Sequence, residues 1–308
     1  FNGLIGLDVS AYRKFTVDEI LNVDISMTSG YTQTKVNIGR LKNEGLEMLL
    51  TITPVNRKLK WETTFNSAYN RSEVLELANG QERFDVGIGQ YFGTISHEIG
   101  MPLASVRSFD YKRDEKGNII TSAGKPLLGE LKTYGSAIPK WTGGWLNVIT
   151  YRKFRLFTQV DYKFGAVVLS NSNFNFLRHG LSKESLEGRE GGALLEGVNA
   201  DGTPNTTRVP AEDFYSAFRN LGEKFVYDAS FIRLRSVSLG YDLSRLVHKS
   251  FVKGLTISAI ANNVWMIKKY LANLDPESQI SVSDNFQGID THALPTTRSF
   301  GINVSAKL

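Results

Sequence analysis

The chain of 308 residues contains no cysteine, which excludes disulfides and thiolate metal ligands. It also has no run of about 18 apolar residues, so a transmembrane helix is excluded. A membrane β-barrel remains compatible, because its strands alternate apolar and polar residues and escape a hydropathy window. The net charge is +5, but basic residues never cluster in long runs, and we expect no nucleic-acid partner.

Motifs that carry enzymatic or metal chemistry are also missing. The chain has no G-x-S-x-G sequence, and its four histidines are scattered without metal-ligand spacing. We therefore expect no enzyme activity, no cofactor and no metal site. A barrel hydrolase ranks third among the functional hypotheses, and it would need a catalytic set clustered on one wall.

Period-two alternation is the dominant pattern in what the chain does contain. Near the start, Ile5, Leu7 and Val9 alternate with polar or small residues, as in a strand with two different faces. Similar alternation recurs along the chain and predicts eight antiparallel strands, at 2–14, 42–53, 59–72, 140–151, 154–168, 230–243, 254–267 and 298–308.

The connections between these strands alternate strictly between long and short. The short ones are 54–58, 152–153 and 244–253; the long ones are 15–41, 73–139, 169–229 and 268–297. This rhythm is typical of an outer-membrane barrel, with short periplasmic turns and long extracellular loops. Aromatic residues such as Trp61, Trp141 and Tyr241 lie near strand ends, where interfacial girdles occur; ordinary strand aromatics are the alternative.

The alternation assigns a face to each side chain. We expect lipid contact for Ile5, Leu7, Leu46, Leu50, Leu156, Val160, Ile257, Ile302 and Val304. The opposite, lumen-facing side carries Asp8, Glu47, Glu62, Asn66, Arg155, Asp161 and Lys163. A closed eight-stranded barrel has an interior filled by side chains, where so many charges would need pairing. The eight strands are therefore predicted to be part of a larger barrel, with strands 2–14 and 298–308 not paired to each other.

Several ordered motifs resemble one known family. They are NIGRLKNEGLE at 37–47, WETTFNSAYNRSEVLEL at 61–77, GLSKESLEGRE at 180–190, FVYDASFIRLRSVSLGY at 225–241 and NNVWMIKKYLANLDPE at 262–277. This set is similar to the C-terminal barrel region of SusC/RagA-like TonB-dependent transporters, and the resemblance covers nearly the whole chain. Ala272 departs from the pattern, which usually has glycine there. Leu308 departs as well, because the family usually ends on an aromatic residue.

The resemblance implies a fold, a function and partners. Residues 1–308 would form the last eight strands of a 22-stranded transmembrane β-barrel, without the plug domain and the N-terminal region that contacts TonB. The implied function is TonB-dependent import of a nutrient across the outer membrane of a Gram-negative bacterium. Glycan is the leading substrate and oligopeptide the alternative, captured under a SusD-like surface lipoprotein. The partners would be this lid, TonB, the rest of the barrel and plug, the substrate and outer-membrane lipid.

Two loop segments supply candidate contacts to substrate or lid. They contain Tyr91, Phe92, Asn173, Phe174, Asn175 and Phe176. Aromatic faces beside amides suit sugar rings or peptides, through stacking and hydrogen bonding. The alternative is that these aromatics pack the loops together or hold a partner protein.

A different class of function is also open at this stage. The chain could be a small complete eight-stranded barrel that acts as an adhesin or a structural anchor. This reading requires strand 2–14 to pair with strand 298–308.

Overall fold

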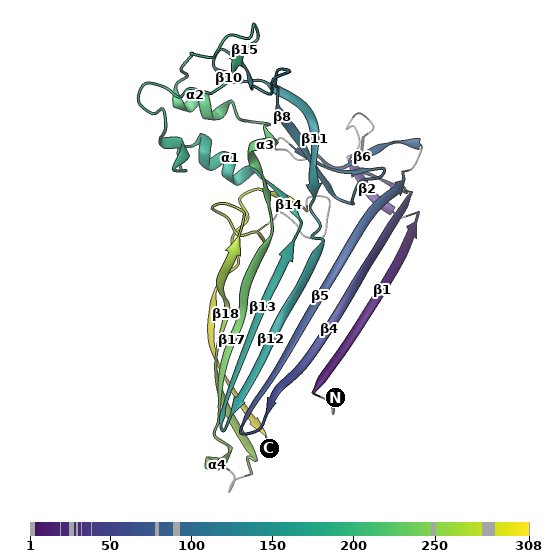
Figure 1. Ribbon diagram of the computed structural model, residues 1–308, viewed down its shortest axis with the longest axis vertical. Helices are drawn as coiled ribbons and strands as arrows, with labels where there is room; N and C mark the ends of the chain where they lie inside the picture. Colours follow the sequence, from purple (N-terminus) through teal and green to yellow (C-terminus); the bar gives the residue numbers. More distant parts are fainter. Residues whose placement is uncertain are drawn as a thin grey trace.

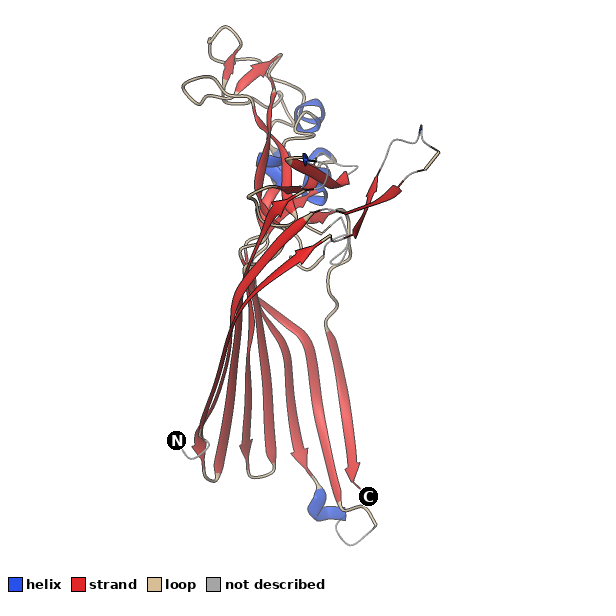
Figure 2. Cartoon of the chain, turned by 90° about the vertical axis from the view of Figure 1, so that its right-hand side faces the viewer, coloured by secondary structure: helices blue, strands red, loops and turns tan. Residues whose placement is uncertain are grey.

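An eight-stranded antiparallel sheet forms a tall wall, and a body of loops covers one end of it (Figures 1 and 2). The computed structural model describes residues 4–18, 20–24, 28, 30–31, 33–37, 39–77, 80–88, 93–247, 251–278 and 287–307. The wall strands, in spatial order, are β1 (Ile5–Val17), β4 (Arg40–Asn56), β5 (Leu59–Glu76), β12 (Trp141–Tyr151), β13 (Phe154–Phe164), β17 (Phe231–Asp242), β18 (Gly254–Lys269) and β20 (Ser299–Lys307). All eight predicted strands are present, and β1 and β20 lie at opposite edges of the sheet.

The predicted rhythm of connections is reproduced in space. Short turns join β4 to β5, β12 to β13 and β17 to β18 at the lower end of Figure 1, where both chain ends also lie. In the turn between β12 and β13, Arg152 adopts a left-handed conformation with φ 55°, as tight hairpin turns require. The long connections all lead into the body at the upper end.

The register across the wall separates an apolar face from a polar one. Leu7 lies opposite Leu50, which lies opposite Phe65, and Phe65 lies opposite Trp145 on β12. The same row continues through Val160 to Leu234. All nine residues predicted to meet lipid fall on this face. Three apolar residues of β20 illustrate its exposure: Phe300 is 75% exposed, Ile302 76% and Val304 63%. So large an apolar surface would be unfavourable in water and suits a hydrocarbon environment.

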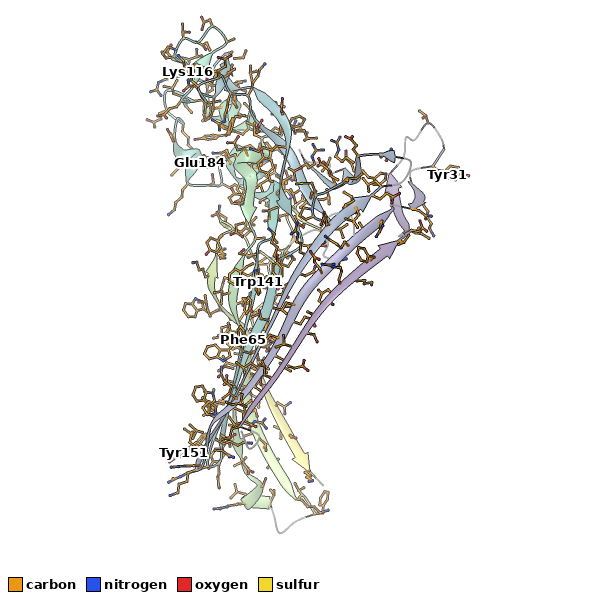
Figure 3. All side chains as sticks on the ribbon, turned by 45° about the vertical axis from the view of Figure 1, so that its right-hand side comes forward. Tyr31, Phe65, Lys116, Trp141, Tyr151 and Glu184 are labelled. Atoms are coloured by element: carbon orange, nitrogen blue, oxygen red, sulfur yellow. The ribbon has the colours of Figure 1, made fainter. Side chains whose placement is uncertain are left out.

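Two aromatic rows bound the apolar face. In the upper row Tyr69 packs against Trp141, and in the lower row Phe154 packs against Tyr241, with ring centroids 4.8 Å apart in each pair. Figure 3 shows Trp141, Phe65 and Tyr151 at successive heights along the wall. Strand β12 runs ten residues from the upper row to Tyr151, about 33 Å of strand at ~3.3 Å per residue. A tilt of roughly 40° shortens this to about 25 Å along the membrane normal, the height of the apolar band of outer-membrane barrels.

The loops contain structure of their own, which the sequence patterns did not predict. One sheet combines β6 (Arg83–Ile88), β7 (Gly93–Glu98), β8 (Ser105–Tyr111) and β11 (Leu128–Ser136). Smaller sheets are made by β9 (Ile120–Ser122), β10 (Lys125–Pro126) and β15 (Val198–Asn199), by β14 (Val167–Ser170), β16 (Val226–Asp228) and β19 (Ile289–Asp290), and by β2 (Ile20–Asp24) and β3 (Gln33–Asn37). The helices are α1 (Asn171–Arg178), α2 (Ala211–Ser216), α3 (Gly222–Phe225), α4 (Ser244–Val247) and a 3-10 turn at Glu184–Leu186. None of the helices in the described part of the chain is long and apolar enough to cross a bilayer.

The main hydrophobic core lies in this loop body. Its buried members come from β7, β8, β14, α1, α3 and β19, and include Ile95, Val106, Leu169, Phe174, Leu221, Phe225 and Ile289. The apolar face of the wall has no such core, and its side chains, such as Ile302, are exposed in this chain. The loop body is therefore a folded unit built on the strand ends.

Substituting arginine at two adjacent positions of β4 tests the assignment of faces. Leu50 lies near the middle of the apolar band, so Leu50→Arg in the complete barrel is expected to cost about 2–4 kcal/mol of unfolding free energy in a bilayer. Leu49 lies on the polar face between Asp8 and Asn66, so Leu49→Arg should cost less than about 1 kcal/mol. Equilibrium unfolding in phospholipid vesicles measures both values. Equal costs would contradict the assignment.

Candidate functional site on the polar face and in the loop body

The polar face of the wall carries a continuous row of hydrophilic groups. Asp8 lies opposite Leu49, followed across the sheet by Asn66, Gly144 and Asp161. These strands line a cavity of about 480 Å³ that is open on one side. Ser10, Glu47 and Gln159 also line it. All seven residues predicted to face the lumen have the strand parity of this side. The face suits a hydrated passage or contact with another polar protein surface.

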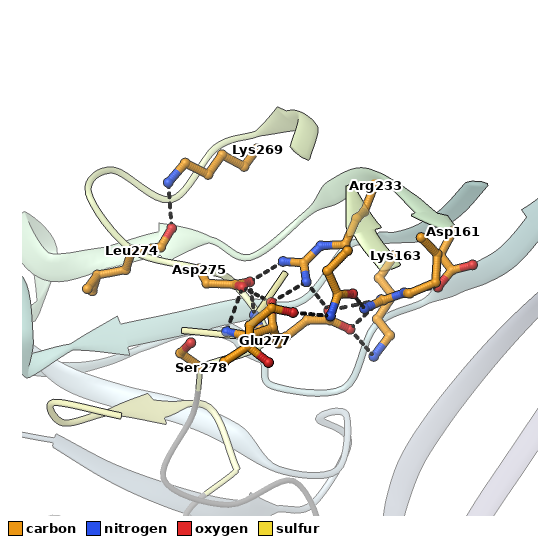
Figure 4. Close-up of polar contacts among 12 residues, drawn as sticks. Asp161, Lys163, Arg233, Lys269, Leu274, Asp275, Glu277 and Ser278 are labelled. Atoms are coloured by element: carbon orange, nitrogen blue, oxygen red, sulfur yellow. Dashed lines mark hydrogen bonds and ion pairs between the residues drawn. The ribbon is translucent and has the colours of Figure 1, made fainter. Parts of the chain in front are cut away.

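At the upper part of this face, β13 and β17 meet the chain segment that follows β18. Charged side chains meet there, called the arginine–carboxylate cluster below: Asp161, Lys163, Arg233, Arg235, Asp275 and Glu277. Figure 4 shows this region and labels all of them except Arg235. Arg233 and Arg235 lie on β17, on either side of a shift in strand register, and their ion pairs with Glu277 place both side chains on the polar face. The segment that carries Asp275 and Glu277 folds back over the wall to reach them. The cluster contains three cations and three carboxylates and is electrically balanced.

The contacts within the cluster are short and mutually supporting. Arg235 donates from Nε to Asp161 at 2.5 Å and forms an ion pair with Glu277 at 2.9 Å. Arg233, whose side chain is only 3% exposed, pairs with Asp275 and with Glu277, the latter at 2.9 Å. Burial would raise the pKa of the Asp275 carboxyl, but hydrogen bonds from the Thr296 hydroxyl and the Glu277 N–H, together with Arg233, hold that pKa below its ordinary value. The cluster therefore fixes a loop segment to the wall through ion pairs from both of its carboxylates.

A second polar assembly holds helix α1 in place. The Ser170 hydroxyl accepts the Asn173 N–H at 3.1 Å and caps the helix, while donating to Asp290 at 2.8 Å. Asp290 is fully buried and also accepts the Ser172 N–H at 3.3 Å. The His292 N–H donates to the Ser172 hydroxyl at 2.7 Å. These bonds tie α1 to the segment around β19, which lies more than one hundred residues further along the chain.

The structure places the predicted contact residues of 173–176 inside α1. Asn173 bonds to the Ala272 carbonyl at 3.2 Å and to Asn273 at 3.0 Å. Phe174 is 3% exposed and packs against Phe225, with ring centroids 5.5 Å apart. The packing alternative raised from the sequence thus accounts for Phe174.

The remaining predicted contacts divide into two groups. Asn175 is 9% exposed and bonds to His292 at 3.1 Å, and Phe176 is half-buried. Tyr91 and Phe92 lie outside the described residues. Direct contact of these six residues with substrate or lid stays a prediction.

Two members of the cluster, Asp161 and Lys163, were predicted to face the lumen. The other four lie within the motifs at 225–241 and 262–277, and no role was predicted for them. The available signal was the Arg-Leu-Arg spacing at 233–235, which puts two cations on one side of a strand. The acidic pair in Asp-Pro-Glu at 275–277 supplies the matching charge. Their pairing depends on a loop path that no local pattern specifies.

Comparisons with known proteins agree with this architecture. The chain is 24% identical, over 99% of its length, to the TonB-dependent receptor SusC of Bacteroides thetaiotaomicron, and covers 30% of that protein. It is 22% identical, over its whole length, to TonB-dependent receptor P3 of Formosa agariphila, and covers 33% of it. No protein-family model matches the chain.

Solved structures show the same fold. The RagAB peptide importer in its closed-closed state superposes with a TM-score of 0.72 at 20% identity, over 99% of this chain and 33% of the other. The open-open state of that importer gives a TM-score of 0.69 at 21% identity. The chain thus spans about a third of the length of the relatives it matches.

These matches define the class of protein to which the fold and the polar wall are similar. It is the barrel of TonB-dependent transporters. Within that class, the chain is similar to the SusC/RagA-like transporters, and the resemblance predicted from the ordered motifs is confirmed. The relatives named above are receptors and importers by name.

Removing one cation of the cluster should release the segment that it holds. Arg233→Met leaves Asp275 and Glu277 without their buried partner, which typically costs about 3–5 kcal/mol. We expect hydrogen exchange of the Glu277 and Ser278 amides to accelerate at least about tenfold. The control is Arg13→Met, because Arg13 is 66% exposed and its pair with Glu44 is worth little. Unchanged exchange in the Arg233 variant would refute the fixing role of the cluster.

A buried histidine makes the loop body sensitive to acid. Burial lowers the pKa of His97 to about 4, against a smaller opposing effect of a backbone hydrogen bond at Ser96, and its Nδ1 accepts the Ala104 N–H. Because an opened loop would take up a proton below about pH 6.5, stability should fall between about pH 6.5 and pH 4, by up to about 3 kcal/mol.

Hydrogen exchange of 93–111, followed from pH 7 to pH 4 and corrected for intrinsic rates, measures this loss. His97→Gln should flatten the dependence. An identical pH profile in the variant would show that another group is responsible.

Proposed function

We propose that this chain forms part of the barrel wall and the extracellular loops of a TonB-dependent nutrient importer in the outer membrane of a Gram-negative bacterium. One observation carries the proposal. An eight-stranded wall with one apolar and one polar face, topped by folded loops, superposes over nearly its whole length on a known importer. The wall would supply the lumen lining, and the loops would form the external entrance. TonB would act through parts of the protein outside these residues.

The substrate is proposed to be an oligosaccharide, as the leading class for SusC-like proteins. A second class, oligopeptides, has a specific observation in its favour, because the superposing structures are described as peptide importers. Both classes are polar and oligomeric, and both suit a hydrated lumen with carboxylate, amide and cationic groups on its wall.

A surface lipoprotein is the proposed partner of the loop body. The similarity to SusC and to RagAB supports a lid of the SusD or RagB kind over the upper end of the barrel. The loop body supplies a preformed surface for such a partner, because its own core and the bonds around α1 keep it folded.

The alternative of a complete eight-stranded adhesin or anchor is not supported. That reading needs a ladder between β1 and β20, whereas the strand order places them at opposite edges of an open sheet. The wall is better explained as a sector whose edges continue into neighbouring strands of a wider barrel.

Uptake by cells tests the function directly. Cells that carry the full-length protein and its lipoprotein are supplied with labelled oligosaccharides or labelled oligopeptides, and import is compared with that of cells lacking either the protein or TonB. Import of one class should disappear in both deletion strains. Import that survives the loss of TonB would refute energised transport. The class of labelled substrate whose import disappears is the class that the protein transports.

Single cysteines test the orientation in the membrane, and this stretch has none of its own. Lys116→Cys lies on the loop body and should react with a membrane-impermeant maleimide on intact cells. Asn56→Cys lies at the end of β4 and should react only after the outer membrane is permeabilised. The reverse pattern would invert the topology.

A further inference from the structure

A small cavity in the loop body combines cationic and amide groups. It has a volume of about 260 Å³ and lies between α1, the segment after α2 and the segment after β19. The lining groups that matter here are Asn171, Phe174, Asn175, Arg178, Arg219 and His292. A second cavity of about 450 Å³ shares Arg178 and His179 with it and continues toward Tyr215.

The walls of the 260 Å³ cavity are held in fixed positions. Asn171 donates to the Thr291 hydroxyl at 3.2 Å, and the Asn175 amide bonds to His292 at 3.1 Å. Phe174 packs into the core of the loop body behind them. A ligand would thus enter a preformed site, with little ordering cost.

The lining of this cavity contains basic side chains and no acidic ones among the described residues. The basic side chains are two arginines and two histidines. No ion pair involves Arg178 or Arg219 within that part of the chain. Other arginines of the loop body have partners within the chain: Arg113 forms an ion pair, and Arg189 and Arg208 donate to backbone carbonyls.

Arg178 is the more constrained of the two arginines. Its guanidinium lies 5.3 Å from the centre of the Phe174 ring, and its buried Nε has no hydrogen-bond partner in the structure. A buried donor without a partner is unfavourable, and a planar guanidinium matches the two oxygens of a carboxylate. Arg219 lies exposed at the rim, where it can meet an approaching anion.

We propose that this cavity binds a carboxylate group of the incoming oligomer, with Arg178 and Arg219 as its charge partners and the amides of Asn171 and Asn175 contacting neighbouring hydroxyl or amide groups. The volume is below the roughly 300–1,000 Å³ of sites for drug-sized ligands. The site therefore takes one terminal residue rather than a whole oligomer. The carboxylate can belong to a uronic acid or to a peptide C-terminus. This inference rests on the proposed import function and adds a preference for acidic cargo.

Calorimetric binding to the full-length protein with its lipoprotein tests the proposal. The probes are α-1,4-trigalacturonate and its neutral counterpart α-1,4-galactotriose, and trialanine and its C-terminal amide. In one of the two pairs, the probe that carries the carboxylate should bind at least tenfold more tightly than its neutral partner. Arg219→Gln should remove that preference while changing affinity for the neutral member less than twofold.

Matched variants separate the charge from the fold. Arg208→Gln removes a cation elsewhere in the loop body, where Arg208 donates to the Gly192 carbonyl, and should leave binding unchanged. Arg178→Lys keeps the charge but loses the planar fork, and should weaken carboxylate binding without affecting the neutral probe. If Arg178→Lys does not fold, the Arg219 series decides alone.

Three outcomes would overturn the proposal: no carboxylate probe binds at millimolar concentration, acidic and neutral probes bind equally, or Arg208→Gln acts like Arg219→Gln. Failure of the import function has a different signature, since uptake would then be independent of TonB whatever the cavity binds. Uptake that needs TonB but does not distinguish the probes would refute the cavity alone.

Discussion

The two-residue period of the wall strands is the constraint on which the rest of the structure depends. Every backbone group within a bilayer must be paired, so a spanning strand needs a neighbour on each side and a side-chain pattern with two faces. From Leu7 through Leu50 and Phe65 to Trp145, the register keeps apolar groups on one face of adjacent strands. A slip of one residue would exchange the faces of a whole strand, bringing Asp8 into hydrocarbon.

This constraint also explains why the hydrophobic core lies away from the wall. Apolar side chains of the strands point to lipid and cannot pack against one another across an interior. The loops, which lie beyond the aromatic rows, fold by ordinary burial around residues such as Phe225 and Leu221. The wall therefore exposes its apolar side chains, whereas the loop body buries its own in a core.

The sequence predicted the wall well because alternation is a local property. All eight strands were found, and the boundaries shifted by only a few residues, as for β5, which continues to Glu76. The loop body was not predicted. The segment from Asn171 to Arg178 is polar at its start and only eight residues long, yet it forms α1, with Ser170 as its cap and Asp290 as the acceptor of its Ser172 N–H. Asp290 is too distant in sequence for any pattern to have paired the two.

The sequence indicated which types of residue the site contains, but not how they are arranged. Amides and aromatics at 173–176 were predicted as contacts to substrate or lid, but their burial depends on neighbours such as Ala272 and Phe225. The arginines were more informative than the aromatics, although only the structure shows which have carboxylate partners. Arg233 and Arg235 are matched by Asp161, Asp275 and Glu277, so those cations serve the fold.

Cations without a carboxylate partner need a separate explanation. A guanidinium held in a cavity without an acidic partner gains nothing from ion pairing, and partial burial reduces its hydration. The chain has carboxylates available in the same loop body, for example Glu184, which pairs with Lys224 at 2.5 Å. Since Arg178 is instead placed against Phe174 and beside two amides, the balance that this cavity lacks is best supplied by a ligand. The contrast between a neutral cluster that fixes the loop and a cationic cavity above it separates the groups that stabilise this chain from those that we propose to bind a ligand.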